Sequence, residues 1–367
     1  MNDDVLYQVA LTMVPQIGHV HASILVKHFE SAVSIFAAKK RELECIPGIG
    51  AVRATAIKKF DGFDKARAEL AFIEKYKITP LFLSDINYPQ RLLQCYDPPT
   101  LLFYRGKASL NAGRIVAIVG TRNKTEYGKQ QTEKLVEELA KHGIMVVSGL
   151  ALGIDAIAHK ASVKNKVPTI GVVAHGLDSM YPPDHTALAK EMVREGGGIL
   201  TEFRRETKPD KHNFPIRNRI VAGMCDALVV IETDIKGGSM ITAELAYGYN
   251  KDVFAIPGKN TDRKSAGCNH LIKQNKAMLL TDAHHLLDTL GWVNTKPDKK
   301  KKQKELFIQL TEQEEKIVKV LQEKGSLHID ELHIKSGLNS SAAAAAILNL
   351  ELQQIICSLP GKIYQLL

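Results

Sequence analysis

Short apolar runs alternate with helical segments through the centre of this chain, and this alternation limits the folds that it can adopt. Five apolar runs have the length of buried strands: residues 114–119, 144–147, 168–173, 227–231 and 252–256. Glu126–Lys141, between the first two runs, has apolar residues at helical spacing. Strands that alternate with helices form βαβ units and build a parallel sheet covered by helices. We therefore expect an α/β fold with a parallel sheet across residues 80–290.

Glycine-containing turns follow several of these runs. Gly120-Thr121-Arg122 follows the first run, Ser148-Gly149 follows the second, and Gly237-Gly238-Ser239 comes after the fourth, where a helix is expected to begin. Ligands of parallel sheets bind beyond the carboxyl ends of the strands. The N–H groups of such turns and of helix N-termini bind anions. We predict a phosphate-binding groove here, with the Ser148 hydroxyl facing a phosphate; the alternative is glycine-rich connections without a ligand.

A basic segment with an aromatic residue precedes the fourth run. Phe214-Pro215-Ile216-Arg217-Asn218-Arg219 follows Lys211, and guanidinium groups, amides and aromatic faces bind phosphates and stack on bases. The alternatives are ordinary surface arginines and a Phe214 that anchors a helix over residues 214–224. The predicted DNA-binding residues are Gly120, Thr121, Arg122, Ser148, Gly149, Lys211, Phe214, Arg217, Asn218, Arg219, Gly238 and Ser239.

The charge of the chain is unevenly distributed. The net charge is +9, and the central region and the lysine-rich segment 291–304 are both basic. Residues 305–367 hold five basic and eight acidic side chains and are therefore acidic. A basic excess of this kind favours a polyanionic partner.

A short repeat opens the chain within a predicted helical domain of residues 1–75. Val14-Pro15-Gln16-Ile17-Gly18 recurs as Ile46-Pro47-Gly48-Ile49-Gly50, each time before a helix. Proline fixes φ, glycine permits a tight turn, and the helix that follows offers free N–H groups. The repeat resembles a tandem helix-hairpin-helix (SAM-like) domain that grips nucleic-acid backbone. The alternative is a purely structural helical domain, and Gln16 in place of the first glycine weakens the case for the first copy.

The C-terminal part divides into a charged linker and a small domain. Residues 291–305 are too charged to form a core and predict a basic linker. Thr311 with Glu314 has the pattern of a capping box at a helix start. Two more helices over 329–335 and 340–350 and a final hairpin predict a winged helix in 306–367. Its acidity, with Ala342–Ala346 on the would-be recognition helix, favours a protein contact over duplex recognition.

The patterns of the common nucleotide-dependent enzymes are missing. Seven residues separate Gly120 from Gly128-Lys129, and Gln130 follows, so this is not a phosphate-binding P-loop. No GxGxxG follows the first run, which argues against a dinucleotide cofactor. We therefore expect no cofactor.

Hydrolytic and metal chemistry are also disfavoured. Ser148, Asp155 and His159 lack a GxSxG context, and the latter two are i, i+4 neighbours on a predicted helix. The five cysteines are scattered without a CxxC motif. No apolar run approaches the length of a membrane span, and no signal peptide opens the chain. We expect a cytoplasmic protein that is not an enzyme, holds no metal and does not contact the membrane.

Many motif blocks, in order, resemble those of the DprA/Smf (DNA-processing protein) family of bacteria. The blocks that carry the resemblance are Tyr88-Pro89, Pro98-Pro99, Arg105-Gly106, Ala117–Arg122, Tyr127-Gly128, Ser148–Asp155 with His159, Gly176–Pro182, Phe214–Arg219, Ser239–Ala243, Pro257-Gly258 and Gly267–Ile272. Departures are Gly237, Thr201, Ala174 and Asn275, none of which removes a basic or aromatic side chain.

The resemblance implies an extended Rossmann-like central domain between the helical domain and the winged helix. It also implies a non-enzymatic role: sequence-independent binding of single-stranded DNA and loading of the RecA recombinase during natural transformation. The family further suggests a homodimer through the central domain.

A second interpretation comes from nucleotide-binding relatives of this fold. Gly237-Gly238 followed by Glu244 resembles the turn of Rossmann-like nucleotide sensors and nucleotide phosphoribohydrolases. Such a protein would use an arginine and a glutamate on a nucleoside monophosphate. The basic excess and the flanking modules disfavour it.

Overall fold

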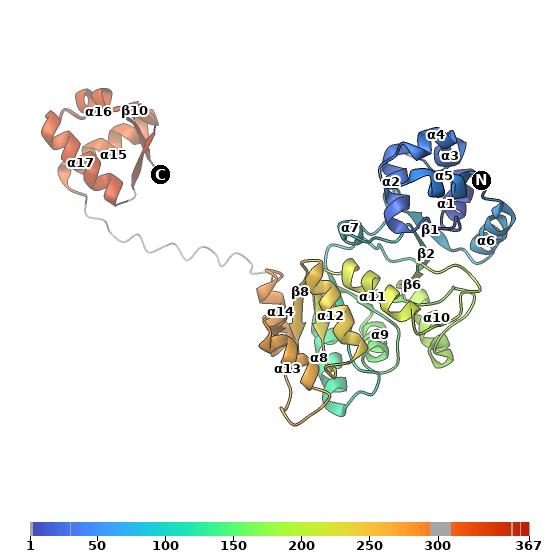
Figure 1. Cartoon of the computed structure of the whole chain (residues 1–367). Coiled ribbons are helices and arrows are strands. Elements are labelled where there is room, and N and C mark those ends of the chain that lie inside the picture. Colours follow the sequence, from blue (N-terminus) through green and yellow to red (C-terminus); the bar gives the residue numbers. More distant parts are fainter. Residues whose placement is uncertain (1–2, 30, 294–309, 354, 360, 367) are drawn as a thin grey trace. The chain divides into compact units, whose positions relative to one another are not determined.

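The computed structural model describes residues 3–29, 31–293, 310–353, 355–359 and 361–366. The chain divides into two compact units, residues 1–293 and 294–367, each with its own core (Figure 1). The predicted basic linker, 291–305, lies outside the described residues from residue 294 onward.

A nine-stranded sheet forms the centre of the first unit, in the order β1-β2-β6-β5-β4-β3-β7-β8-β9. Strands β3 to β9 run parallel, and β1 and β2 add an antiparallel edge beside β6. The strands are β1 (Thr79–Phe82), β2 (Leu101–Gly106), β3 (Ile115–Val119), β4 (Met145–Ser148), β5 (Thr169–Val172), β6 (Gly198–Thr201), β7 (Ala227–Val230), β8 (Asp252–Ala255) and β9 (Met278–Leu279). The predicted α/β fold with a parallel sheet is confirmed.

Helices cover both faces of this sheet because its strands are apolar on both sides (Figure 1). Val116 and Ile118 of β3 pack in one cluster with α8 and α9, whereas Ile115 and Ala117 pack in another with α11 and α12. Alternate side chains of one strand therefore serve two cores. The helices after β1 are α7 (Gln90–Leu93), α8 (Glu126–Lys141), α9 (Ile154–Lys164), α10 (Thr186–Arg194), α11 (Asn213–Met224), α12 (Gly238–Gly248), α13 (Ala266–Lys273) and α14 (Ala283–Thr289), with a 3₁₀ turn at Pro183–His185.

The N-terminal helices pack against the antiparallel edge of the sheet. Phe82 of β1 and Leu101 and Phe103 of β2 belong to their hydrophobic cluster. The predicted repeat is visible in the backbone: Gln16 and Gly48, at equivalent positions, both have positive φ, of 64° and 88°. The helices are α1 (Asp3–Leu11), α2 (His19–Phe29), α3 (Ala32–Ala37), α4 (Lys40–Glu44), α5 (Gly50–Lys58) and α6 (Phe63–Lys75).

The second unit is a winged helix, as predicted. Thr311 and Glu314 form the expected capping box, in which the Thr311 N–H donates to Glu314 Oε2 at 2.7 Å. A third strand, which the sequence did not predict, joins the hairpin. The elements are α15 (Glu312–Lys324), β10 (Ser326–His328), α16 (Ile329–Ser336), α17 (Ser340–Leu352), β11 (Ile356–Leu359) and β12 (Ile363–Leu366). Across the described ranges of both units, the structure contains no helix that is long and apolar enough to cross a membrane.

The strand order places a crevice beside the carboxyl ends of β3 and β7. The chain winds from β3 outward through β4, β5 and β6, then returns to the other side of β3 at β7. At such a switch point the loops after the two central strands diverge and leave room for a ligand. The turns that the sequence singled out are the loops at this point.

Replacing Gly153 with Ala is expected to destabilise the loops at the crevice. Gly153 has φ of 82°, and an added Cβ would lie 2.5 Å from the carbonyl oxygen of Arg122. We expect the free energy of unfolding to fall by about 2–3 kcal/mol, as measured by urea denaturation. Gly113→Ala is the control, because its Cβ would meet no described atom within 4 Å. Equal effects at the two positions would contradict this account.

Candidate nucleic-acid interface

A groove of about 530 Å³ lies at the switch point between β3 and β7. It is lined by the turns after β3 and β4, by the segment before α12, and by the start of α11. All of the predicted DNA-binding residues line it except Ser148 and Arg219. The sequence thus located a single depression built from segments far apart in the chain.

Buried hydrogen bonds fix the turn that carries Arg122. The Thr121 N–H donates to the carbonyl oxygen of Glu232 at 2.7 Å, and the Ile154 N–H donates to the Thr121 carbonyl oxygen at 3.2 Å. The buried carboxylate of Glu232 accepts from the Thr125 N–H at 3.0 Å. The turn is therefore held at both ends, while the Arg122 side chain is exposed.

Arg217 forms part of the groove wall as a buried group. Arg217 is only 5% exposed, and its guanidinium donates to the carbonyl oxygens of Gly149 and Val172. Its Nε donates to Asn218 Oδ1 at 3.1 Å. Burial lowers the pKa of Arg217 to about 10, and the carboxylate of Asp155 opposes that shift. Most of the donors of this guanidinium are therefore engaged within the protein.

Asp155 shares this buried site. It accepts from the Gly149 N–H at 3.0 Å, and burial raises its pKa while Arg217 opposes the rise. Gly149 lies between the two, and an added Cβ there would lie 2.7 Å from Arg217 Nη2 and 2.8 Å from Asp155 Oδ2. The need for glycine at this position comes from the arginine behind it.

The structure does not bring Arg219 or the Ser148 hydroxyl into the groove. Arg219 contacts the Asp97 carbonyl oxygen and Glu202 Oε2, the latter at 2.5 Å. Residues two apart on a helix point in opposite directions, so Arg217 and Arg219 serve opposite sides of α11. The Ser148 hydroxyl is buried and donates to the Ile118 carbonyl oxygen at 2.6 Å. The prediction that it faces a phosphate is therefore wrong.

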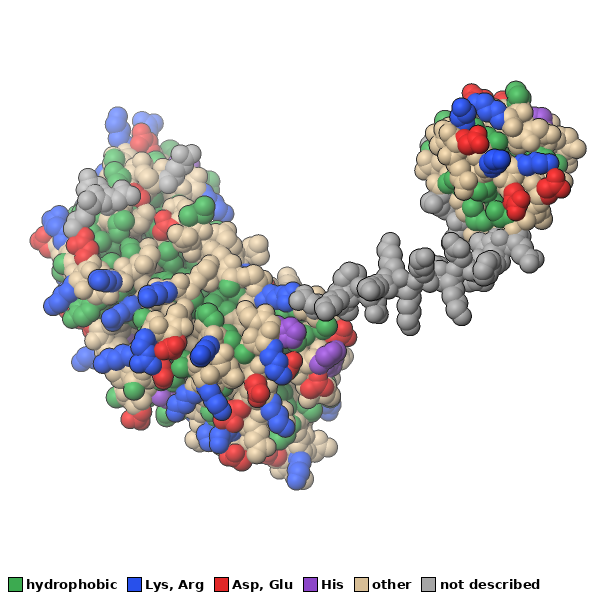
Figure 2. Space-filling model, turned by 180° about the vertical axis from the view of Figure 1, so that it is seen from behind, with side chains coloured by type: hydrophobic (Ala, Val, Ile, Leu, Met, Phe, Trp, Pro, Cys, Tyr) green, Lys and Arg blue, Asp and Glu red, His purple; other side chains and the backbone are tan. Residues whose placement is uncertain are grey.

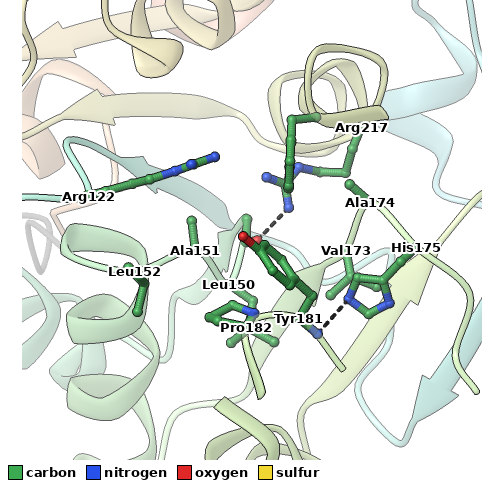
Figure 3. A pocket seen from close by; sticks show the side chains of 12 residues that line it. Arg122, Leu150, Ala151, Leu152, Val173, Ala174, His175, Tyr181, Pro182 and Arg217 are labelled. Carbon is green, nitrogen blue, oxygen red and sulfur yellow. Dashed lines mark hydrogen bonds between the residues drawn. The ribbon is translucent and has the colours of Figure 1, made fainter. Parts of the chain in front are cut away.

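Phe214 lines both the groove and a small apolar pocket of about 40 Å³. Arg122, Leu150 and Tyr181 lie around that pocket (Figure 3). The guanidinium carbon of Arg122 lies 5.2 Å from the centroid of the Phe214 ring, and the ring of Tyr181 lies 6.1 Å away on another loop. Leu150 and Leu152 also line the pocket. Tyr181 was not among the predicted site residues, since no charge or glycine turn marks it; the only signal was its place in a motif block.

The N-terminus of α12 opens into the same groove. Gly238 and Ser239 line it, and the Ser239 hydroxyl has no hydrogen-bond partner among the described residues although Ser239 is only 8% exposed. The first N–H groups of an α-helix lack partners within the helix and carry a partial positive charge. This end of α12 thus offers donors to an anion.

The charged side chains that line the groove favour the binding of an anion. Arg122 and Lys211 line it and are exposed, which leaves them available to a ligand. Of the lining carboxylates, Asp155 is buried, and Asp234 accepts from Arg263 Nε at 2.5 Å. That hydrogen bond lowers the pKa of Asp234. The groove therefore presents free cations and engaged carboxylates.

The residues of the two catalytic arrangements considered from the sequence have other partners. His159 Nδ1 lies 2.7 Å from Thr169 Oγ1 rather than beside Asp155, and burial lowers its pKa to about 3. Glu244, on which the nucleotide-cleaving interpretation depends, contacts Lys276 Nζ at 2.8 Å and lines a different depression. The described part of the chain contains no group of three or more His, Cys, Asp or Glu residues placed to hold a metal ion.

Two known domain families match the chain. Residues 79–291 match the family described as DNA recombination-mediator protein A, and residues 303–362 match the DprA winged helix domain. Protein Smf from Synechocystis sp. is 36% identical over 297 residues, covering 79% of this chain and 73% of that protein. DNA processing protein DprA from Bacillus subtilis is 41% identical over 213 residues, covering 58% of this chain and 71% of that protein.

Solved structures show the same fold. The X-ray structure of DNA processing protein A from Streptococcus pneumoniae aligns with a TM-score of 0.63 at 30% identity, covering 78% of this chain and 98% of that one. DNA processing protein A from Helicobacter pylori, a structure that describes a single-stranded DNA binding mode, aligns with a TM-score of 0.53 at 34% identity. That alignment covers 58% of this chain and 95% of that one.

Arg217 and Arg122 are expected to differ in their effect on stability. Arg217→Met leaves two buried carbonyl oxygens without their donor and removes the buried positive charge that stabilises the Asp155 carboxylate. The free energy of unfolding should therefore fall by about 3–5 kcal/mol in urea denaturation. Arg122→Met is the matched control at an exposed site, where the change should stay within about 0.5 kcal/mol. Similar losses for both variants would show that Arg217 is not a structural member of the groove wall.

Proposed function

The chain belongs to the DNA recombination-mediator protein A family, and from this premise we propose that it binds single-stranded DNA in the groove. The observation that carries the proposal is the convergence of Arg122, Lys211 and the α12 N-terminus at the β3/β7 switch point. These groups bind phosphates without regard to the base, which accounts for binding without sequence specificity. The single-stranded DNA binding mode described for the Helicobacter pylori relative supports the assignment.

Phe214 supports a preference for single strands over duplex DNA. Its ring is partly exposed beside the two phosphate-binding cations, and base–aromatic stacking contributes about 1–3 kcal/mol per base. Bases of a duplex are already paired and stacked, so only a single strand offers a free base face. In the unbound protein Arg122 occupies one face of this ring. A base that stacked on this face would displace the arginine side chain.

The second part of the proposal is that the protein helps to load RecA on the bound strand and does not itself catalyse a reaction. The family is one of recombination mediators, and the RecA partner follows from that resemblance. A mediator must hold the strand and recruit the recombinase through different surfaces.

We also propose a homodimer through the central region. On α12, Ile241 and Tyr247 are exposed, and Ile235 lies exposed just before that helix. Ile241 also lines the groove, so an apolar dimer surface formed by these side chains would border the phosphate-binding turns. Its pairing with a second copy would give two grooves in one particle.

Removing both free cations is expected to flatten the salt dependence of single-strand binding. Each phosphate contact contributes about 0.7 to the slope of log K against log salt concentration, so Arg122→Ala with Lys211→Ala should lower the slope by about 1.4. The measurement is a fluorescence anisotropy titration on mixed-sequence oligonucleotides between low and moderate salt. Lys134→Ala with Lys190→Ala removes the same charge from exposed sites outside the groove. An unchanged slope in the groove variant, or an equal change in the control, would refute the assignment.

RecA loading is expected to depend on the groove. With DNA already coated by single-strand-binding protein, addition of this protein should stimulate strand exchange by the RecA of the same organism. The Arg122→Ala, Lys211→Ala variant should lose that stimulation because it no longer holds the strand. Tight DNA binding by the unaltered chain without any stimulation would leave it a plain DNA-binding protein.

A further inference from the structure

Glu69 is a carboxylate of the N-terminal helices that is buried against the central sheet region. The residue is 4% exposed on α6, and its neighbours include Phe72, Phe103 and Phe203. A buried carboxylate is costly unless hydrogen bonds compensate for its lost hydration. The hydrogen-bond partners of Glu69 should therefore indicate its structural role.

Both partners of Glu69 belong to Arg205, in the loop between β6 and α11. Glu69 Oε1 accepts from the Arg205 backbone N–H at 3.0 Å, and Oε2 lies 3.5 Å from the Arg205 Nε. The backbone hydrogen bond ties the loop itself, whatever the position of the arginine side chain. This loop leads directly to Lys211 and Phe214 of the groove.

A loop that lines the small pocket beside the groove packs on the tied segment. The Gly176 N–H donates to the Thr207 carbonyl oxygen at 3.0 Å, and an added Cβ on Gly176 would lie 2.5 Å from the Arg204 carbonyl oxygen. The loop that begins at Gly176 carries Tyr181, which lines the pocket beside Phe214 (Figure 3). Leu177, the next residue, packs with the core of the N-terminal helices.

We propose that Glu69 is a positioning residue of the groove, which lets the N-terminal helices raise affinity for single-stranded DNA without touching the strand. Through Arg205 it holds the segment that presents Lys211, and through the Thr207–Gly176 contact it supports the loop that carries Tyr181 into the pocket beside the groove. The inference rests on the proposed function for its effect on DNA, but the loop contact itself does not.

The first experiment tests whether Glu69 acts through the groove cation. Glu69→Ala should weaken single-strand binding roughly three- to ten-fold and lower the salt slope by about 0.7, because Lys211 loses its fixed position. In a Lys211→Ala background the same substitution should have little further effect on the slope. Glu69→Gln, whose amide oxygen still accepts from the Arg205 N–H, should bind within about two-fold of the unaltered protein.

The matched control is Glu74→Ala, which removes an exposed carboxylate from the same helix. Glu69→Ala that lowers the melting temperature but leaves affinity and slope unchanged would reduce Glu69 to a structural tie and overturn the proposal. An equal loss of slope with and without Lys211 would also overturn it. An effect as large for Glu74→Ala would assign the loss to charge alone.

The second experiment needs no DNA and separates this inference from the proposed function. Trypsin can cut the loop after Arg204, Arg205 and Lys211, and native-state cleavage reports local opening. Glu69→Ala should speed cleavage at these sites by roughly five-fold or more, with Glu69→Gln and Glu74→Ala unchanged, as followed by mass spectrometry. Unchanged cleavage would refute the loop tie. If Glu69→Ala speeds cleavage but the unaltered protein does not bind single strands, the loop tie stands and the proposed function is refuted.

Discussion

The groove depends on the hydrogen bonds that the buried guanidinium of Arg217 donates. This guanidinium joins the N-terminal part of α11 to the carbonyl oxygens at the ends of β4 and β5, which are Gly149 and Val172. The same group neighbours the Asp155 carboxylate, which in turn accepts the Gly149 N–H. A charge buried in this way persists only when its partners stay in place, so the loop, the helix and the strand ends form one assembly. The exposed cations Arg122 and Lys211 lie on the surface of this assembly.

The arginines in and behind the groove therefore have two different tasks. Arg217 and Arg219 are largely buried and hold the framework on opposite sides of α11, whereas Arg122 is exposed. A buried guanidinium with its donors engaged adds shape and a fixed positive field, while an exposed one can follow a phosphate. The N-terminal helices contact the loop that precedes α11 through its backbone, because Glu69 accepts a hydrogen bond from the Arg205 N–H.

The sequence predicted the parallel strands well because their apolar runs are uninterrupted. The predicted strand bounds agree with β3, β4, β5, β7 and β8 to within about one residue at each end, and α8 agrees at both ends. It missed β1, β2 and β6, which take part in the antiparallel pairings on one side of the sheet, and β9, which has only two residues. Local sequence pattern gives little guidance to such strands. Within the site, glycine turns located the groove correctly. The direction of each side chain could not be predicted, since helix phase sends Arg219 to Glu202 and strand phase buries Ser148.

The two outer edges of the sheet differ, and the difference bears on whether a strand of another molecule can pair with them. At one end, residues of β1 and β2 belong to the hydrophobic cluster of the N-terminal helices, which pack on one face of the sheet there. At the other end β9 is only two residues long, although both residues are exposed. A strand that short offers few free N–H and C=O groups to a passing chain. The β9 edge of the sheet therefore offers little for a strand of another molecule to pair with.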